Sequence, residues 1–151
     1  LEALPTPARI AALRQLWSTS LPTANPECTI LTGLGALYGG FDMEQGTEGF
    51  MTGFAFPEIL KAMNAAEQAK DFEKAHAIYQ RFLPLIVFEQ QPGVAVRKEL
   101  YRLRGLIESG HVRHPAPPKA APALAKALKE QLERSFPGVD VTKPLPPELF
   151  S

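Results

Sequence analysis

Two short apolar segments, separated by a glycine-rich stretch, constrain the fold of this sequence most. Residues 28–32 are rich in β-branched side chains and end at Gly33, which predicts a strand. Residues 49–56 predict a second strand, apolar enough to be buried on both faces, which stops at Pro57. A short helix over residues 41–45 fits between them, and strand–helix–strand order predicts parallel pairing with a crossover. Two parallel strands alone leave both sheet edges open, so we expect this pair to belong to a larger sheet.

The remainder of the sequence predicts helices. Thr6 can cap a first helix that has Pro7 at its first position, because the missing N–H of proline would be unpaired there. Four further helices follow residue 57, with Asp71 as a cap, Pro84 as a bend and a proline-rich connector over residues 110–122. The predicted apolar faces consist of Ile10, Leu13, Leu16 and Trp17; Ile59, Leu60, Met63 and Ala66; Phe72, Ala75, Ile78, Tyr79, Phe82 and Ile86; Val96, Leu100, Leu103 and Ile107; and Leu124, Leu128 and Leu132.

Length and charge narrow the class of protein. A closed (β/α)₈ barrel has eight strands and needs at least about 200 residues. This sequence of 151 residues has two predicted strands, so we expect it to be a fragment that lacks about six of them. Sixteen basic and sixteen acidic residues give no overall field to attract nucleic acid. No apolar run approaches the roughly 18 residues of a membrane span, and no secretory signal opens the sequence. With Cys28 as its single cysteine, the chain is predicted to be cytoplasmic.

Several other patterns have ordinary explanations. Glycines 33, 35, 39 and 40 lack the Gly-Lys-Ser/Thr ending of a phosphate loop, so tight turns account for them. His76, His111 and His114 have no partners at metal-ligand spacing. The basic residues of 97–104 are interrupted by Glu99, which favours a solvated face over nucleic-acid binding. Trp17 is expected to pack in a core or interface, and nothing singles out Tyr38 near the end of the first strand.

Several motifs together resemble one enzyme family. Leu31-Thr32-Gly33 is similar to a Leu-Ser-Gly motif that ends a seventh strand, and residues 46–52 are similar to the Gly-Ala-Xaa-Gly-Val-Ile-Ser that forms an eighth. Residues 1–7 resemble the stretch that follows a Schiff-base lysine. Lys98, Leu100, Gly105, Ile107, Arg113 and Pro115 echo the C-terminal helix of the same family. In order and spacing, residues 1–118 resemble the dihydrodipicolinate synthase/N-acetylneuraminate lyase family.

The resemblance implies an α/β fold, the C-terminal part of a (β/α)₈ TIM barrel followed by a helical extension. It divides the chain into the last βα units (1–70), the helical extension (71–135) and a proline-rich tail (136–151). It implies a catalytic lysine immediately before Leu1. In one alternative this chain is a fragment of a longer polypeptide that carries the lysine; in the other, the lysine carries a covalent substrate adduct and the sequence begins after it. The implied substrate-binding residues are Gly33, Leu34, Met51 and Thr52, with Thr32 as a weaker candidate.

The implied activity is that of a Schiff-base lyase or dehydratase acting on a 2-oxo acid. Leu34-Gly35 replaces an acidic pair of the dihydrodipicolinate-forming relatives, and residues 53–58 are bulkier than theirs, which resembles the 2-keto-3-deoxy-sugar-acid branch. The alternatives are 4-hydroxy-tetrahydrodipicolinate synthase proper and a non-enzymatic helical oligomerisation module. No metal, nucleotide or organic cofactor is implied. The expected partners are a small 2-oxo acid and further copies of the chain in a dimer or tetramer, with no nucleic acid and no membrane.

Overall fold

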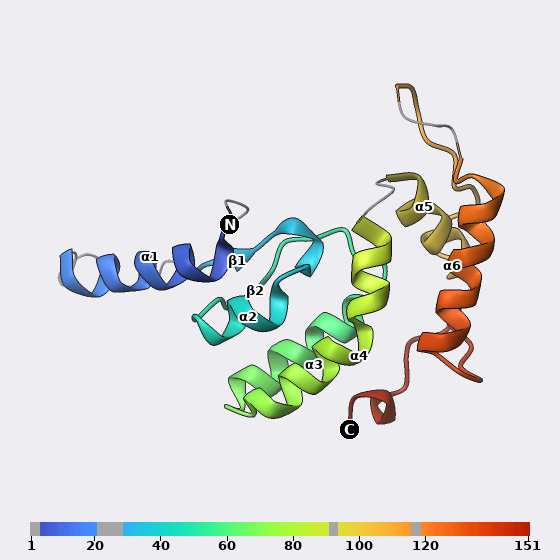
Figure 1. Ribbon diagram of the computed structural model, residues 1–151. Coiled ribbons are helices and arrows are strands. Elements are labelled where there is room, and N and C mark those ends of the chain that lie inside the picture. The colour runs from blue at the N-terminus through green and yellow to red at the C-terminus, as the bar shows by residue number, and fades with distance from the viewer. Residues whose placement is uncertain (1–3, 21–28, 91–93, 116–118) are drawn as a thin grey trace.

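The computed structural model describes residues 4–20, 29–90, 94–115 and 119–151, and it is rich in helices (Figure 1). The two strands form a small sheet between the first helix, which projects to one side, and the later helices, which extend to the other. In chain order the elements are α1 (Thr6–Ser20), β1 (Leu31–Thr32), the 3₁₀ turn η1 (Leu34–Ala36), α2 (Gly39–Glu44), β2 (Gly49–Phe50), α3 (Pro57–Gln68), α4 (Phe72–Gln90), α5 (Val94–Leu103), α6 (Pro122–Ser135) and the 3₁₀ turn η2 (Pro147–Phe150).

The sheet confirms the predicted parallel pairing. Leu31 lies opposite Gly49 and Thr32 opposite Phe50, with α2 as the crossover. One further hydrogen bond follows the last residue of β2: the N–H of Met51 donates to the carbonyl of Thr32 (2.8 Å). Of the strand predicted over residues 28–32, the structure assigns the last two residues to β1, and Cys28 lies outside the described residues.

The second strand is shorter than predicted. The sequence predicts a strand over residues 49–56, whereas ladder pairing ends at its second residue. Beyond that point, side chains of later helices bind the backbone: the N–H of Ala55 donates to the carboxylate of Glu89 (3.0 Å), and the phenol of Tyr101 donates to the carbonyl of Gly53 (2.6 Å). Buried backbone groups need partners of some kind, and here helices α4 and α5 supply them instead of a neighbouring strand.

The core lies between α3, α4 and α6. The predicted apolar positions Ile59, Met63, Phe82, Ile86 and Leu128 are all fully buried. The same cluster includes side chains of the segment that follows β2 and of the C-terminal tail. Burying an aliphatic or aromatic side chain of this size contributes about 1.5–3 kcal/mol. Packing therefore fixes the segment after β2 against the helices.

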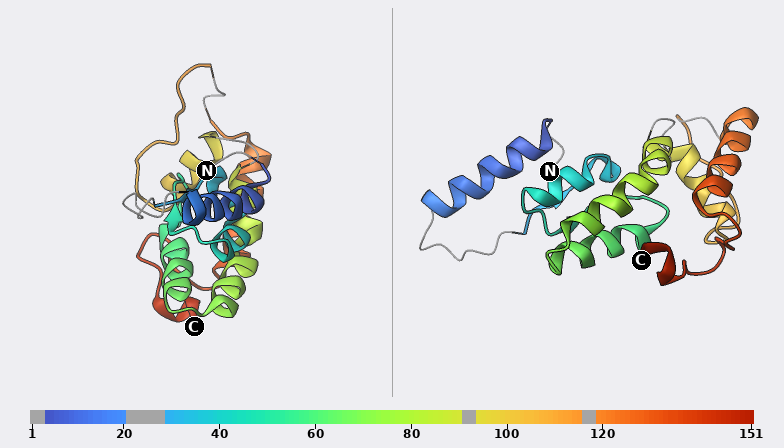
Figure 2. Two further views of the ribbon diagram at one scale, coloured as in Figure 1. Left: turned by 90° about the vertical axis from the view of Figure 1, so that its left-hand side faces the viewer. Right: turned by 60° about the horizontal axis from the view of Figure 1, so that its bottom comes forward.

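The predicted cap of α4 is confirmed, since the carboxylate of Asp71 accepts a hydrogen bond from the N–H of Lys74 (3.0 Å). Three predicted apolar faces are partly wrong. At the start of α4, Phe72 is 38% exposed, although the later positions of the same face are buried. In α1, Ile10 is buried, but Leu13 and Leu16 are 42% and 58% exposed, because α1 packs on α2 and lies apart from the other helices (Figure 2). In the last face before the connector, Ile107 lies beyond the end of α5, because the chain turns away at a left-handed glycine, Gly105 (φ +70°).

The proline-rich tail docks on the helices. Leu145 is buried, and the guanidinium of Arg81 donates to the carbonyl of Leu149 (2.7 Å). The ring of Phe150 lies 6.1 Å from that of Phe82. The tail thus packs against the middle of α4. In the described residues, no helix is long and apolar enough to cross a membrane.

Candidate active site

The carboxyl ends of β1 and β2 meet at one edge of the sheet, because the two strands are parallel. Barrel enzymes place their sites at this end of their strands. A depression of about 440 Å³ lies there, and three of the four predicted substrate-binding residues line it: Leu34, Met51 and Thr52. The fourth, Gly33, is buried directly before Leu34 and is not part of the lining. The other lining residues are Gly35, Gly53, Gln90 and Arg97.

The wall contributed by the turn after β1 has an unusual backbone. Leu34, Gly35 and Ala36 all have left-handed φ values, of +50°, +64° and +70°. A non-glycine residue in this region costs about 1–2 kcal/mol, and such strain concentrates at functional sites. Glycine is required at the middle position, because a Cβ at Gly35 would lie 1.2 Å from Nε2 of Gln90. The sequence gives no signal for the conformations of Leu34 and Ala36.

The other wall is formed by the residues after β2. The backbone of Met51 is held by its bond to β1, while its side chain is 64% exposed at the rim. The hydroxyl oxygen of Thr52 accepts the N–H of Phe54 (3.0 Å). A hydroxyl group can accept and donate at once, so that of Thr52 keeps a proton to donate into the depression.

Thr32, the weaker candidate, has a different environment. Its side chain is buried, and its hydroxyl donates to the buried carboxylate of Asp42 on α2. This contact ties the end of β1 to its crossover helix. Thr32 is therefore placed behind the depression and not in its lining.

Glu89 and Arg97 are the main site residues that the sequence did not single out. Glu89 is fully buried at the end of α4, where one carboxylate oxygen accepts from Nε of Arg97 (2.6 Å) and the other from the N–H of Ala55 (3.0 Å). Burial raises the pKa of Glu89, although these two donors oppose the rise. The available signal was an acidic residue at the end of an apolar helix with a basic residue eight positions later, a pattern too common to be diagnostic.

A second ion pair, between Arg104 and Glu58, also contacts the segment after β2. The guanidinium of Arg104 lies 2.5 Å from a carboxylate oxygen of Glu58, donates to the carbonyl of Ala55, and stacks 4.5 Å above the ring of Phe56. Burial alone would raise the pKa of Glu58, but the hydrogen bonds and charge of Arg104 outweigh it and leave this pKa below its ordinary value. The residues that follow Thr52 are thus fixed by two arginines and a buried glutamate.

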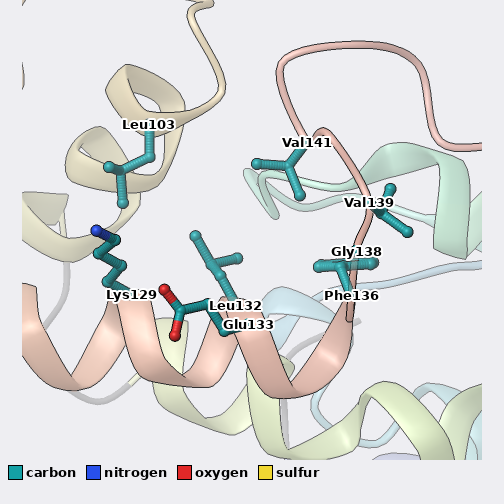
Figure 3. A pocket seen from close by; sticks show the side chains of 8 residues that line it. All are labelled: Leu103, Lys129, Leu132, Glu133, Phe136, Gly138, Val139 and Val141. Carbon is teal, nitrogen blue, oxygen red and sulfur yellow. The ribbon is translucent and has the colours of Figure 1, made fainter.

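Other hollows and polar groups lie away from the strand ends. One pocket lies between α5, α6 and the tail (Figure 3). Its lining is largely apolar: Leu103, Lys129, Leu132, Glu133, Phe136, Gly138, Val139 and Val141. His76 pairs with Glu44 on α2 (2.8 Å). In the described part of the chain, no three histidine, cysteine, aspartate or glutamate side chains come close enough to hold a metal ion.

Comparison with known proteins places this geometry in context. No protein-family model matches the chain. The chain is 39% identical over 77 residues, half of its own length, to an L-2-keto-3-deoxyarabonate dehydratase of Azospirillum brasilense. It superposes with a TM-score of 0.81 and 32% identity, over 89% of its length, on the crystal structure of a dihydrodipicolinate synthase from Rhodopseudomonas palustris. The chain spans 25% of the first relative and 44% of the second.

The parallel strand pair, its crossover helix and the shared strand-end depression are those of part of a (β/α)₈ barrel. The two matches identify the chain as a C-terminal part of the dihydrodipicolinate synthase family. Both the fold and the family predicted from the sequence are confirmed.

Proposed function

We propose that the protein carrying this chain is a Schiff-base lyase or dehydratase that acts on a 2-oxo acid, either pyruvate-type or a 2-keto-3-deoxy sugar acid. The observation that carries the proposal is the depression at the strand ends, where Leu34, Met51 and Thr52 come together. We further propose that the catalytic lysine immediately precedes Leu1. Residues 1–3 lie outside the described part of the chain.

The proposed reaction begins when a neutral lysine amine attacks the keto carbon and water leaves, which forms an iminium. The iminium accepts electrons from the neighbouring carbon, so that carbon can lose a proton or a carbon substituent. Loss of the proton followed by departure of a β-hydroxyl gives dehydration. In this scheme Met51 contributes backbone beside the carbonyl end of the substrate, and Thr52 contributes a hydroxyl that can hold or move a proton.

The sugar-acid branch is favoured over dihydrodipicolinate synthesis. Leu34 and Gly35 stand where dihydrodipicolinate-forming relatives carry acidic residues, so this wall of the depression has no carboxylate. The Azospirillum relative is named for a dehydratase of a 2-keto-3-deoxy acid. The Rhodopseudomonas structure is named a dihydrodipicolinate synthase, which keeps 4-hydroxy-tetrahydrodipicolinate synthase as the second candidate.

We also propose a cytoplasmic homo-oligomer, a dimer or tetramer. In this family the helices beyond the barrel commonly mediate such contacts, which here corresponds to the segment predicted over residues 71–135. Sedimentation of the full polypeptide is expected to give a mass of two or four subunits. A monomer would contradict this part of the proposal.

Borohydride trapping tests the proposed activity. The full polypeptide is incubated with pyruvate or a 2-keto-3-deoxy sugar acid, with and without sodium borohydride, and is examined by intact-mass spectrometry. We expect the mass of one reduced adduct per subunit, together with loss of turnover. A protein that turns over the substrate without forming an adduct would refute the Schiff-base mechanism.

Thr52→Val removes the hydroxyl with little change in shape. If that hydroxyl moves a proton, kcat should fall by about 100-fold or more. Thr142→Val, at an exposed threonine of the tail, is the matched control and should leave kcat unchanged. Equal kcat values for the two variants would remove Thr52 from the mechanism.

A further inference from the structure

The strand-end depression contains hydrogen-bond donors that the proposed chemistry does not use. Within the part of the chain that the structure describes, the guanidinium of Arg97 makes one hydrogen bond, from Nε to Glu89, and its two terminal nitrogens have no protein acceptor. Nε2 of Gln90 is buried and also lacks a partner. Both side chains line the depression beside Thr52. A buried donor without an acceptor, such as Nε2 of Gln90, is costly, so a ligand that accepts from it and from the partly exposed Arg97 would be favoured.

These donors are held in place before any ligand arrives. The fully buried carboxylate of Glu89 fixes one edge of the Arg97 guanidinium. The other side of the guanidinium lies against the backbone of Gly53, where a Cβ would come within 2.8 Å of Nη1. The carboxamide of Gln90 lies closer still to Gly35, where a Cβ would come within 1.2 Å of Nε2. Donors fixed in this way lose little conformational freedom on binding.

The charge of the site indicates what kind of acceptor fits. The other lining residues (Leu34, Gly35, Met51, Thr52, Gly53) are uncharged, and the carboxylate of Glu89 offsets the charge of Arg97. A second carboxylate on the ligand would therefore gain little net attraction and would be repelled by Glu89. Neutral hydroxyl groups can use the same donors without that repulsion, and Leu34 and Met51 can cover the carbon chain between them.

We propose that Arg97, positioned by Glu89, and Gln90 bind the hydroxyl-bearing tail of a 2-oxo acid, and that they select hydroxylated substrates over dicarboxylic ones. The inference rests on the proposed function, because it assigns the tail end of the same substrate. It makes Arg97 a specificity-determining residue contributed by the first turn of α5.

Arg97→Met in the full polypeptide tests the assignment, since methionine keeps much of the apolar stem and removes the donors. We expect KM for a 2-keto-3-deoxy sugar acid to rise about 10- to 100-fold, which is the effect of losing hydrogen bonds to a charged group. Borohydride should still trap pyruvate in this variant, because pyruvate has no tail for Arg97 to bind. Arg97→Lys should recover part of the affinity. Arg102→Met on the same helix, at an exposed ion pair with Glu99, is the matched control and should behave as the wild type.

A second variant covers the case in which Arg97→Met does not fold. Gly53→Ala keeps every donor but displaces the guanidinium, and KM for the sugar acid should again rise at least about 10-fold. If the variants that fold still trap pyruvate and have an unchanged KM for the sugar acid, the assignment of Arg97 and Gln90 is overturned. The proposed function would then still stand. Lower KM for 2-oxoglutarate than for the hydroxylated acid would overturn the selection of hydroxyl groups. Absence of any pyruvate adduct in the wild type would overturn the proposed function, and this inference with it.

Discussion

Replacing Glu89 by alanine tests how the backbone after β2 is held. The change removes the fully buried carboxylate that accepts from the N–H of Ala55 and from Nε of Arg97. Removing one partner of a buried ion pair costs about 3–5 kcal/mol, because the other charge is left unpaired. The side chain of Arg97 is 26% exposed and can turn towards water, so its share is smaller. The N–H of Ala55 has no such escape and leaves a buried unsatisfied donor, which costs about 1–3 kcal/mol.

Together these terms predict that Glu89→Ala lowers the free energy of unfolding by about 2–4 kcal/mol. That is a large part of the roughly 5–15 kcal/mol that a typical protein has. Glu89→Gln keeps an oxygen for the N–H of Ala55 and should cost less than Glu89→Ala. Urea denaturation followed by circular dichroism measures both changes.

Glu130→Ala is the matched control for this measurement. Glu130 is half-exposed on α6 and lies 3.8–3.9 Å from two flanking basic side chains. Surface pairs of this kind contribute little, so its loss should change the free energy of unfolding by less than about 1 kcal/mol. A Glu89→Ala protein no less stable than Glu130→Ala would refute the view that the buried carboxylate holds the segment after β2.

Three further changes probe the core, the strained turn after β1 and the ion pair between Glu58 and Arg104. Leu128→Ala, at a fully buried position of α6, should cost about 2–5 kcal/mol in urea denaturation, whereas Leu106→Ala, at an exposed position, should stay within about 0.5 kcal/mol; equal effects would contradict the assigned core. Gly35→Ala should lower the thermal midpoint, because it combines a left-handed φ with a direct overlap; an unchanged midpoint would contradict the described turn. The pKa of Glu58 is lowered by Arg104, so the stabilising contribution of this pair is fully present above the ordinary carboxyl pKa and is lost as pH falls through the lowered value. Glu58→Gln should therefore flatten the acid side of the stability profile, and an unaltered profile would argue against the pair.

The helices of this chain could be predicted because their periodicity is local. Apolar positions three and four residues apart define α3 and α4, and all of them except Phe72 are buried as expected, with Ile59 and Phe82 at zero exposure. A strand is different, because its length depends on a partner for each backbone group. Residues 51–56 are as apolar as a strand, yet the N–H of Ala55 and the carbonyl of Gly53 bond to helix side chains, which composition alone cannot reveal.

The candidate site could be predicted only in part, for a related reason. Leu34, Met51 and Thr52 follow directly from strand ends and from the resemblance to a family. Glu89 and Arg97 reach the same place from the end of one helix and the start of the next, so their pairing depends on how α4 and α5 pack. Their roles could be recognised only with the tertiary contacts in view.

The proposed Schiff-base mechanism is tested most directly by locating the covalent adduct in the full polypeptide. After borohydride reduction with a 2-oxo acid, proteolysis and tandem mass spectrometry identify the modified residue. We expect a single modified lysine, immediately before Leu1. A different residue at that position, or an adduct on a lysine within the 151 residues, would contradict it.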